Sequence, residues 1–498
     1  MSSRLYRRLV PAWSSLAAVA ALCAAAARAD IHVEPYLQDP QTDAMSVLWW
    51  TDESQPDSRV TFGRGSLNQW APGSNEYVPS MDKYVHEARL TGLLPETRYD
   101  YRAVSGPLAS EVYGFTTAVR RSSNFAVSIL GDGRTDNDQV IADHRAVLSR
   151  AALLGPDLVF EIGDMVQFGT ATHWDALYRR IVTATDTSDP GIDLGSRVPY
   201  HTAVGNHEIY DGTLSGGLQT SMARYKAFAS NPANGSSNPD WEERYYSMEY
   251  GCATFIVLDT NNTSSDEHDN SRELADGTTP DWEPGSEQYD WMIEQLRRAR
   301  RASALTFVMM HPSPYSRGFH GDPTDTVSGY QLRVLEPVFR QYGVDAVITS
   351  HDHTVEHCLT GPPGFEAEMD GDDPNNLHWL VQGNSGQTAR PASPDWRTWM
   401  DILDNDAEPF YSTWFYDWEG AGERSFLHVE VTREPDNAWR ASFRTVQADG
   451  DVFDEFSILR PDVPEPATAA LLVTGMLALL GRRRRQGVAS RRETICPP

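Results

Sequence analysis

The sequence FAVSILGD, residues 125–132, runs from apolar and β-branched residues into a Gly-Asp pair. The pattern returns as DLVFEIGD at 157–164, and a third run, VPYHTAV at 198–204, leads into Gly-Asn-His-Glu at 205–208. Short apolar runs bounded by glycine are typical of buried strands. Because helical stretches separate these runs, the pattern predicts an α/β layered fold with polar residues at the carboxyl ends of its strands.

Four further apolar runs extend this pattern: ATFIVL at 253–258, LTFVMM at 305–310, DAVITS at 345–350 and HWLVQG at 378–383. His311 follows the second of them, and His351-Asp352-His353 follows the third. The spacing of apolar residues predicts helices over 138–153 and 286–300, and residues 425–459 read as closing antiparallel strands. Ligands of open α/β sheets bind at the carboxyl ends of the strands, so we expect these polar residues to meet there, with Asp352 pointing outward.

Residues 31–119 show a different pattern of short alternating runs with turn residues between them, which predicts an all-β sandwich. The stretch LLPETRYDY at 93–101 resembles the tyrosine-corner region of a fibronectin type III fold. Trp49 or Trp50 would supply its core aromatic residue. These residues are expected to pack the module and to take no part in chemistry.

The two ends of the chain read as targeting segments. Residues 1–29 have a basic start, an apolar centre and small residues before Asp30, as a secretory signal peptide does. At the other end, Val-Pro-Glu-Pro at 463–466 precedes 15 apolar or small residues and then four arginines, and such a run is shorter than the about 20 residues of a spanning helix. This layout resembles the PEP-CTERM sorting signal, which implies a transient membrane anchor, an exosortase-type processing enzyme and export to the bacterial cell surface, periplasm or extracellular matrix. A plain tail anchor is the alternative.

The chain has 498 residues and a formal net charge of −28, although its two ends are rich in arginine. The region between them is therefore strongly acidic, which argues against nucleic acid as a partner. Cys252 and Cys358 lie in that region, and the sequence leaves open whether they form a disulfide or stay as two buried thiols. The sequence has no His-Glu-x-x-His motif, which argues against a zinc protease.

Carboxylate, amide and imidazole ligands together suit a pair of divalent or trivalent cations, and two such metals can clamp a phosphoryl group. The order Gly-Asp, Gly-Asp, Gly-Asn-His-Glu, His and His-x-His resembles that of the calcineurin-like metallophosphoesterase superfamily. With the sandwich and its Pro-Tyr-Leu-Gln start at 35–38, the chain is similar to purple-acid-phosphatase-type members. The resemblance implies a multidomain fold: a fibronectin III-like sandwich, then an α/β metallophosphoesterase domain of two central β-sheets flanked by helices. The expected boundaries are 1–29 for the signal peptide, 30–120 for the sandwich, 121–460 for the catalytic domain and 461–498 for the sorting signal.

The resemblance also implies two metal ions, Fe paired with Zn or Mn, and a hydroxide between them that attacks the phosphorus of a small phosphorylated substrate. Asp164 would bridge the metals, and His207 would bind the phosphate and help to protonate the leaving group. Glu208 would orient the neighbouring His207. The first metal would take Asp132 and His353, and the second would take Asn206, His311 and His351.

Two positions depart from the family pattern. Arg134 stands where many members have a metal-binding histidine, and Gln167 stands where purple enzymes have a tyrosine ligand, so the protein is not expected to be purple. Arg134 can act as a phosphate clamp or form a loop salt bridge. His144 belongs either to the site or to the core. Three residues are candidates for the substrate mouth, with loop packing as the alternative: Tyr315, Arg317 and His320.

The sequence thus favours an exported phosphatase that hydrolyses phosphate monoesters. A phosphodiesterase or nucleotidase on the same site is the nearest alternative. A non-catalytic matrix or adhesion protein on a decayed phosphatase scaffold is the alternative of a different class.

Overall fold

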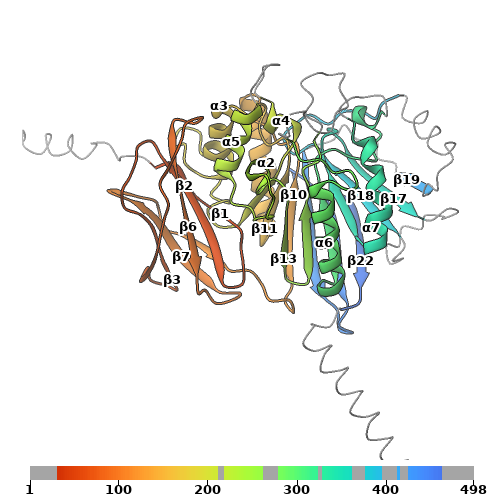
Figure 1. Ribbon diagram of the computed structural model, residues 1–498, viewed down its shortest axis with the longest axis horizontal. Helices are drawn as coiled ribbons and strands as arrows, with labels where there is room; N and C mark the ends of the chain where they lie inside the picture. The colour runs from red at the N-terminus through yellow and green to blue at the C-terminus, as the bar shows by residue number, and fades with distance from the viewer. Residues whose placement is uncertain are drawn as a thin grey trace, which may run out of the picture.

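The computed structural model describes residues 31–210, 218–261, 279–322, 328–361, 376–394, 412–415 and 424–462. A β-sandwich forms the N-terminal part, and an α/β unit packs beside it (Figure 1). The expected signal peptide and residues 463–498 of the expected sorting signal lie outside the described residues. Within the described ranges, no helix has the length and apolar character needed to cross a membrane.

The sandwich consists of two antiparallel sheets, as the alternating runs predict. One sheet has the order β1 (Ile31–Gln38), β2 (Ala44–Thr51), β6 (Lys83–Thr91) and β5 (Glu76–Val78). The other has the order β4 (Gln69–Pro72), β3 (Ser58–Gly63), β7 (Arg98–Ser105) and β8 (Leu108–Ala109), with β9 (Tyr113–Thr116) also paired to β7.

Two aromatic features of the sandwich explain its packing. The Leu94 amide donates a hydrogen bond to Tyr99 Oη at 3.0 Å, which is the contact expected of a tyrosine corner. Trp49 lies in the sandwich core, whereas Trp50 faces the α/β unit and stacks on Phe228 at 4.3 Å between ring centroids. Successive strand residues point to opposite faces, so the two tryptophans serve two different cores.

The α/β unit is built on two sheets. In the described residues, the first has the order β12 (Tyr200–Ala203), β11 (Leu158–Ile162), β10 (Phe125–Leu130), β20 (Ser425–Arg433), β21 (Trp439–Gln447) and β22 (Val452–Arg460). The second has the order β13 (Tyr246–Tyr250), β14 (Ala253–Val257), β15 (Leu305–Met309), β16 (Ala346–Thr349), β18 (Leu377–Gln382), β17 (Val355–Gly361) and β19 (Ser412–Phe415). Strands β10, β11 and β12 run parallel, as do β14, β15, β16 and β18, so each group ends at one edge.

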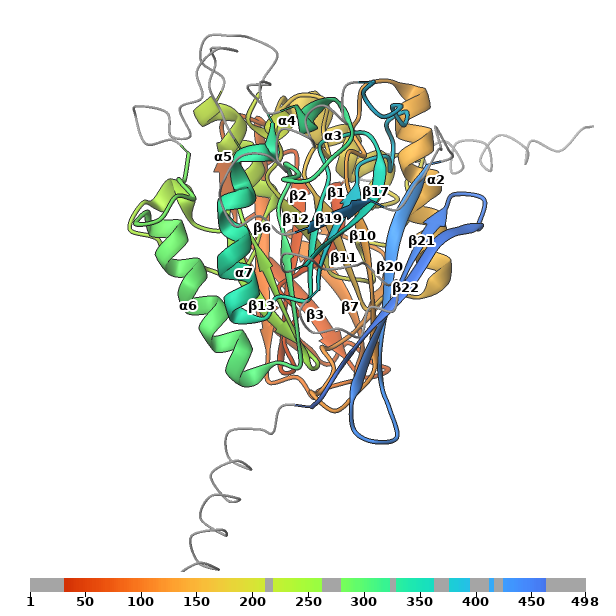
Figure 2. The same cartoon turned by 90° about the vertical axis from the view of Figure 1, so that its right-hand side faces the viewer.

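The two sheets face each other across an aromatic core that includes Phe160, Phe255, Phe307 and Phe443. One outer face is covered by α2 (Asp138–Leu154), α3 (Ala171–Leu177), the π-helix η1 (Tyr178–Val182) and α5 (Leu218–Phe228), and the sandwich packs against this layer. The other outer face is covered by α6 (Glu287–Ala302) and α7 (Glu336–Tyr342) (Figure 2). Short helical segments complete the unit: α4 (Asn206–Ile209), η2 (Pro239–Trp241), η3 (Phe319–Gly321) and η4 (Gly329–Leu335). The fold expected from the family resemblance is therefore present.

Cys252 and Cys358 are both free and buried. Of the two alternatives left open by the sequence, the structure shows the pair of buried thiols.

Candidate metal centre

The predicted polar residues meet where the parallel strands of both sheets end. Asp132 follows β10, Asp164 follows β11, and His351 follows β16, and these three residues have φ angles of 55°, 54° and 73°. Residues other than glycine rarely adopt this left-handed backbone, because the Cβ atom is crowded there. Such strain gathers at functional sites, where the surrounding structure holds it in place.

Four donor atoms gather on one side of Asp164. His311 Nε2 lies 3.2 Å from Asp164 Oδ1, 3.1 Å from Asn206 Oδ1 and 3.2 Å from His351 Nδ1. Ligand atoms of Asp164, His311 and His351 all lie within 4.8 Å of one another. Metal–ligand bonds of about 2.1 Å place neighbouring ligand atoms at such separations, so this donor set fits the second metal.

His311 is held in the orientation that a metal ligand needs. Its Nδ1 lies 3.0 Å from the Ile162 carbonyl oxygen and 2.8 Å from Ser350 Oγ, and Ser350 Oγ also donates to the same carbonyl at 2.8 Å. A proton on Nδ1 leaves Nε2 free to bind a cation. Ser350 was not anticipated from the sequence, although it immediately precedes the His-x-His motif.

On the other side of the centre, Asp132 Oδ1 and His353 Nε2 lie 3.5 Å apart. Both atoms are buried and have no hydrogen-bond partner. Buried polar atoms are rarely left unpaired, and a cation between these two would satisfy both. The second oxygen of Asp132 accepts a hydrogen bond from the His351 amide at 2.7 Å, which connects the two halves of the centre.

Arg134 lies at the first-metal side of the centre. Its Nη2 atom is 2.7 Å from Asp164 Oδ2 and 4.0 Å from Asp132 Oδ1. The guanidinium therefore pairs with the Asp164 oxygen that a bridging carboxylate would offer to the first metal. Arg134 Nη1 lies 3.5 Å from Gln167 Oε1, so the two positions that depart from the family pattern contact each other.

Burial and neighbouring charges shift the pKa values of Asp132 and Asp164 in opposite directions. Burial, followed by the charge of Asp164, raises the pKa of Asp132 well above its ordinary value. Burial also disfavours ionised Asp164, but His207, His311 and Arg134 outweigh it and hold the pKa of Asp164 well below its ordinary value. Burial lowers the pKa of His351 well below its usual range. Neutral imidazole and ionised carboxylate are the forms that bind metal, so Asp164 and His351 are already in their ligand forms, whereas Asp132 would release a proton when a cation binds.

Glu208 lies buried beneath the centre. Its carboxylate accepts hydrogen bonds from the amides of Gly205 at 2.6 Å, Asp164 at 2.8 Å, Met165 at 2.8 Å and Val166 at 3.2 Å. Burial, and then the charge of Asp164, raise the pKa of Glu208 to about 8. These bonds fix the strained turn that carries Asp164, whereas the sequence suggested that Glu208 orients His207.

His207 lies at the rim of the centre with its side chain 16% exposed. Its Nδ1 lies 2.6 Å from the Gln167 carbonyl oxygen, and its Nε2 lies 3.7 Å from Asp164 Oδ2. Its amide donates to Asp164 Oδ1 at 2.9 Å. The ring therefore turns one nitrogen toward the centre without belonging to either donor set.

A buried chain of polar side chains supports the turn at 131–134. His144 Nε2 lies 3.2 Å from Glu161 Oε1, and Tyr200 Oη donates a hydrogen bond to the other oxygen of Glu161. A Cβ atom at Gly133 would come within 2.2 Å of His144 Cε1 and 2.4 Å of Glu161 Oε1. His144 is thus a core residue packed directly under the turn, and glycine is required at 133.

The segment after His311 divides between core and rim. Tyr315 is 4% exposed and packs against Trp379 at 4.9 Å between ring centroids, and Arg317 is 5% exposed, so both are packing residues. His320 reaches the centre, where its ring lies 4.1 Å from that of His351. The expectation that Asp352 points outward is wrong: it is 1% exposed and accepts the His320 amide at 3.0 Å, which anchors this segment.

The loop after β18 also contributes, although the sequence offered no candidate there. The amides of Gly386 and Gln387 donate to the Asp132 carbonyl oxygen at 3.3 and 3.1 Å. The Arg390 amide donates to the carbonyl oxygen of His353 at 2.6 Å. The run Gly-Asn-Ser-Gly at 383–386, at the end of a predicted strand, is the sequence signal from which this loop could have been identified as part of the site.

Comparison with known families identifies three segments. Residues 31–117 match the purple acid phosphatase N-terminal domain, residues 134–355 match calcineurin-like phosphoesterase, and residues 462–485 match the PEP-CTERM protein-sorting motif. The PEP-CTERM match indicates an exported protein sorted to the cell surface and implies exosortase processing.

Individual relatives are distant. An uncharacterised protein of Mycobacterium tuberculosis is 28% identical over 65% of this chain and 61% of its own length, so the chain spans about three fifths of that relative. Acid phosphatase type 7 of Danio rerio is 25% identical over 72% of this chain and 85% of its own. Probable inactive purple acid phosphatase 1 of Arabidopsis thaliana is 26% identical over 70% and 56%.

Among solved structures, a purple acid phosphatase from yellow lupin seeds superposes with a TM-score of 0.63 at 20% identity, covering 86% of this chain and 74% of its own. That likeness shows the fold. This chain therefore carries a purple acid phosphatase N-terminal domain and a calcineurin-like metallophosphoesterase domain, followed by a PEP-CTERM sorting motif.

Proposed function

We propose that this chain is an exported phosphatase that hydrolyses small phosphate monoesters with two bound metal ions, Fe paired with Zn or Mn. The observation that carries the proposal is the position of Asp164 between two donor sets. Its Oδ1 faces His311 Nε2 at 3.2 Å, and its Oδ2 pairs at 2.7 Å with Arg134 Nη2, which lies 4.0 Å from Asp132 Oδ1, one of the two unpaired atoms of the other donor set. A carboxylate so placed is the bridge that a dinuclear phosphoesterase centre requires.

Arg134, His207 and Glu208 have separate roles in the proposed reaction. When bound, the two metals supply an activated water and neutralise phosphoryl charge. Arg134, which is 9% exposed, clamps the phosphate with its guanidinium in a body that is otherwise acidic. His207 can pass a proton from Nε2 to the leaving oxygen when its ring is doubly protonated, because Nδ1 keeps its own proton on the Gln167 carbonyl oxygen. Glu208 acts as a positioning residue through the backbone of the Asp164 turn.

We also propose the segment boundaries read from the sequence: 1–29, 30–120, 121–460 and 461–498. A sandwich that ends with β9 at Thr116 and an α/β unit that starts with β10 at Phe125 support the boundary at 120.

The test is hydrolysis of 4-nitrophenyl phosphate and its bis-ester by purified protein loaded with Fe, Zn or Mn. Asp164→Asn should abolish turnover of both. The matched control is Asp157→Asn at the opposite end of β11, where the carboxylate accepts only a peripheral bond from the Ala126 amide at 2.9 Å, and it should keep activity.

The ratio of monoester to diester turnover decides the subclass, and a preference for the diester would replace the monoesterase assignment with a phosphodiesterase. Full activity in Asp164→Asn would contradict the dinuclear assignment. Absence of turnover under every metal would favour a non-catalytic matrix protein on a phosphatase scaffold.

A further inference from the structure

A cluster of aromatic rings lies beside His207, outside both metal donor sets. Phe168 is at its middle, 6.4 Å from the His207 ring at an interplanar angle of 28°. The rings of Tyr210 and His173 each lie 5.5 Å from Phe168 in edge-to-face geometry. Phe168 lies in the loop after β11, His173 lies in α3, His207 lies in α4, and Tyr210 directly follows α4.

The cluster is fixed to the site by hydrogen bonds. The Gly169 amide donates to the Tyr210 carbonyl oxygen at 2.7 Å, which ties the loop of Phe168 to the loop of His207. His173 Nδ1 lies 2.9 Å from both the hydroxyl and the carbonyl oxygen of Thr135, the residue after Arg134. Phe168 therefore contacts both His207, which the proposed mechanism assigns to the leaving group, and His173, which is hydrogen-bonded to the residue after the phosphate-binding Arg134.

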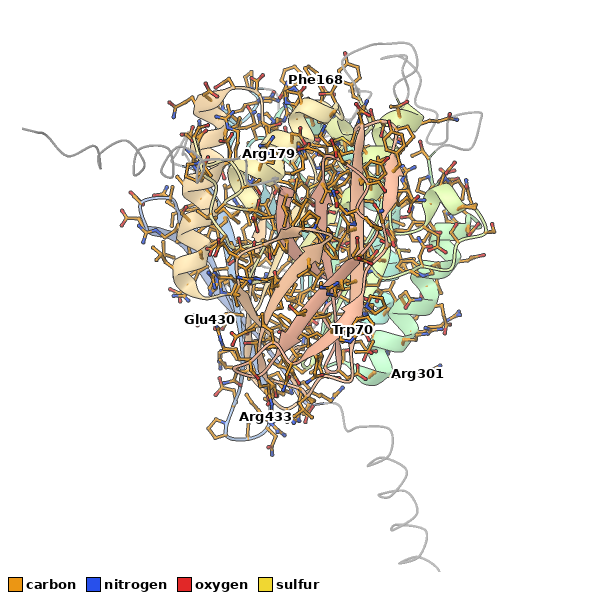
Figure 3. The ribbon with its side chains drawn as sticks, turned by 90° about the vertical axis from the view of Figure 1, so that its left-hand side faces the viewer. Trp70, Phe168, Arg179, Arg301, Glu430 and Arg433 are labelled. Atoms are coloured by element: carbon orange, nitrogen blue, oxygen red, sulfur yellow. The ribbon has the colours of Figure 1, made fainter. Side chains whose placement is uncertain are left out.

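The cluster is also accessible. Phe168 is half-buried, and Tyr210 is 37% exposed. Figure 3 shows Phe168 at the upper end of the molecule, the end at which Figure 1 shows α3 and α4. Aromatic surface left beside a polar centre is stabilised when a second ring stacks on it.

We propose that Phe168, with Tyr210, is a platform that binds a planar aromatic leaving group, so that the preferred substrates are aryl phosphate monoesters. This inference rests on the proposed function, because it takes His207 as the group facing the leaving oxygen. A ring bonded to that oxygen would emerge beside His207, where Phe168 lies. Stacking between neutral rings needs no charge complementarity, which suits a strongly acidic body.

The test compares phenyl phosphate with glycerol 3-phosphate as substrates of the full chain. Because phenol leaves more easily than an alcohol, the measured quantity is the aryl-to-alkyl ratio of kcat/KM in each variant divided by that ratio in the wild type. Phe168→Ala should lower this relative aryl-to-alkyl ratio about tenfold, and Tyr210→Ala should lower the ratio less. Phe168→Tyr should restore it, and Trp70→Ala, which removes a 67% exposed ring from the sandwich, should leave it unchanged.

An unchanged aryl-to-alkyl ratio in Phe168→Ala would overturn the proposal. If kcat/KM then falls equally on both substrates, Phe168 serves to hold His207 in place. If the wild type hydrolyses neither ester, the proposed function fails, and binding of phenylphosphonate against methylphosphonate to metal-loaded protein tests the platform separately. A preference for phenylphosphonate that disappears in Phe168→Ala would support it, and equal affinities in the wild type would contradict it.

Discussion

The Arg134 guanidinium lies 2.7 Å from Oδ2 of Asp164, the carboxylate at the middle of the metal centre. A permanently charged group at this place has two consequences. It holds the pKa of Asp164 down together with His207 and His311, and it places a planar donor fork where a phosphate would arrive.

Arg134→Gln should weaken competitive inhibition by inorganic phosphate at least tenfold, because a hydrogen bond to a charged group is worth about 1.5–3 kcal/mol. The Michaelis constant should rise in step, with a smaller change in kcat. Arg301→Gln, an exposed change at the end of α6, is the control and should leave both constants unaltered. Unchanged phosphate inhibition accompanied by loss of metal would show that Arg134 serves the loop alone.

Glu208→Gln should destabilise the protein by about 1–3 kcal/mol, because the new amide NH₂ would face backbone N–H groups that now donate to a carboxylate. Turnover should fall without being abolished, since the Asp164 turn would shift while every proposed metal ligand remains. Urea unfolding and kcat on one preparation measure both effects. A variant with wild-type stability and turnover would contradict the positioning role.

The buried side chain of His201 should make the stability of the fold sensitive to acid. Burial between Phe160 and Tyr246 lowers the pKa of His201 to about 4, below its unfolded value of 6.5. Between pH 4 and 6.5, His201 is therefore protonated in the unfolded chain and neutral in the folded chain. Its contribution to the free energy of unfolding is complete above pH 6.5 and is lost as the pH falls toward 4, a decrease of roughly 3 kcal/mol.

His201→Gln should remove this part of the pH dependence. Urea unfolding at a series of pH values between 4 and 7 gives the slopes of wild type and variant. The prediction fails if the two slopes agree throughout that range.

Trp50→Ala should cost about 3–5 kcal/mol, because Trp50 is fully buried between the sandwich and the α/β unit and its indole donates to Tyr36 Oη at 3.3 Å. Trp70→Ala, on an exposed ring, should change stability by less than about 0.5 kcal/mol. Thermal unfolding measures both. A neutral Trp50→Ala would mean that the two parts fold without mutual support.

Much of the fold could be predicted because local pattern and tertiary role coincide. The run at 125–130 is β10, and the helix expected over 138–153 is α2. Strand β13 was missed because its sequence, YSMEY, carries a glutamate at an edge of the sheet, and β17 was missed because His and Glu interrupt its apolar pattern. Which of Trp49 and Trp50 fills the sandwich core depends on a partner layer far along the chain.

The site residues could be predicted from their places at strand ends, but their contacts could not. Nothing local to Arg134 indicates that its side chain would pair with Asp164, which lies 30 residues away, just after β11. The burial of Asp352 depends on the segment at 318–320 folding over it. The loop after β18 supports Asp132 through Gly386 and Gln387, which lie 254 and 255 positions further along the chain, and no motif records such a contact.

In the proposed dinuclear centre, Asp132 and His353 hold one metal and Asn206, His311 and His351 hold the other, with Asp164 between them. Elemental analysis of wild type and His353→Ala, purified and loaded identically, tests it most directly. We expect two metal ions per chain in the wild type and one in the variant. One metal per chain in both proteins would contradict it, because the first site would then be occupied by Arg134 in place of a cation.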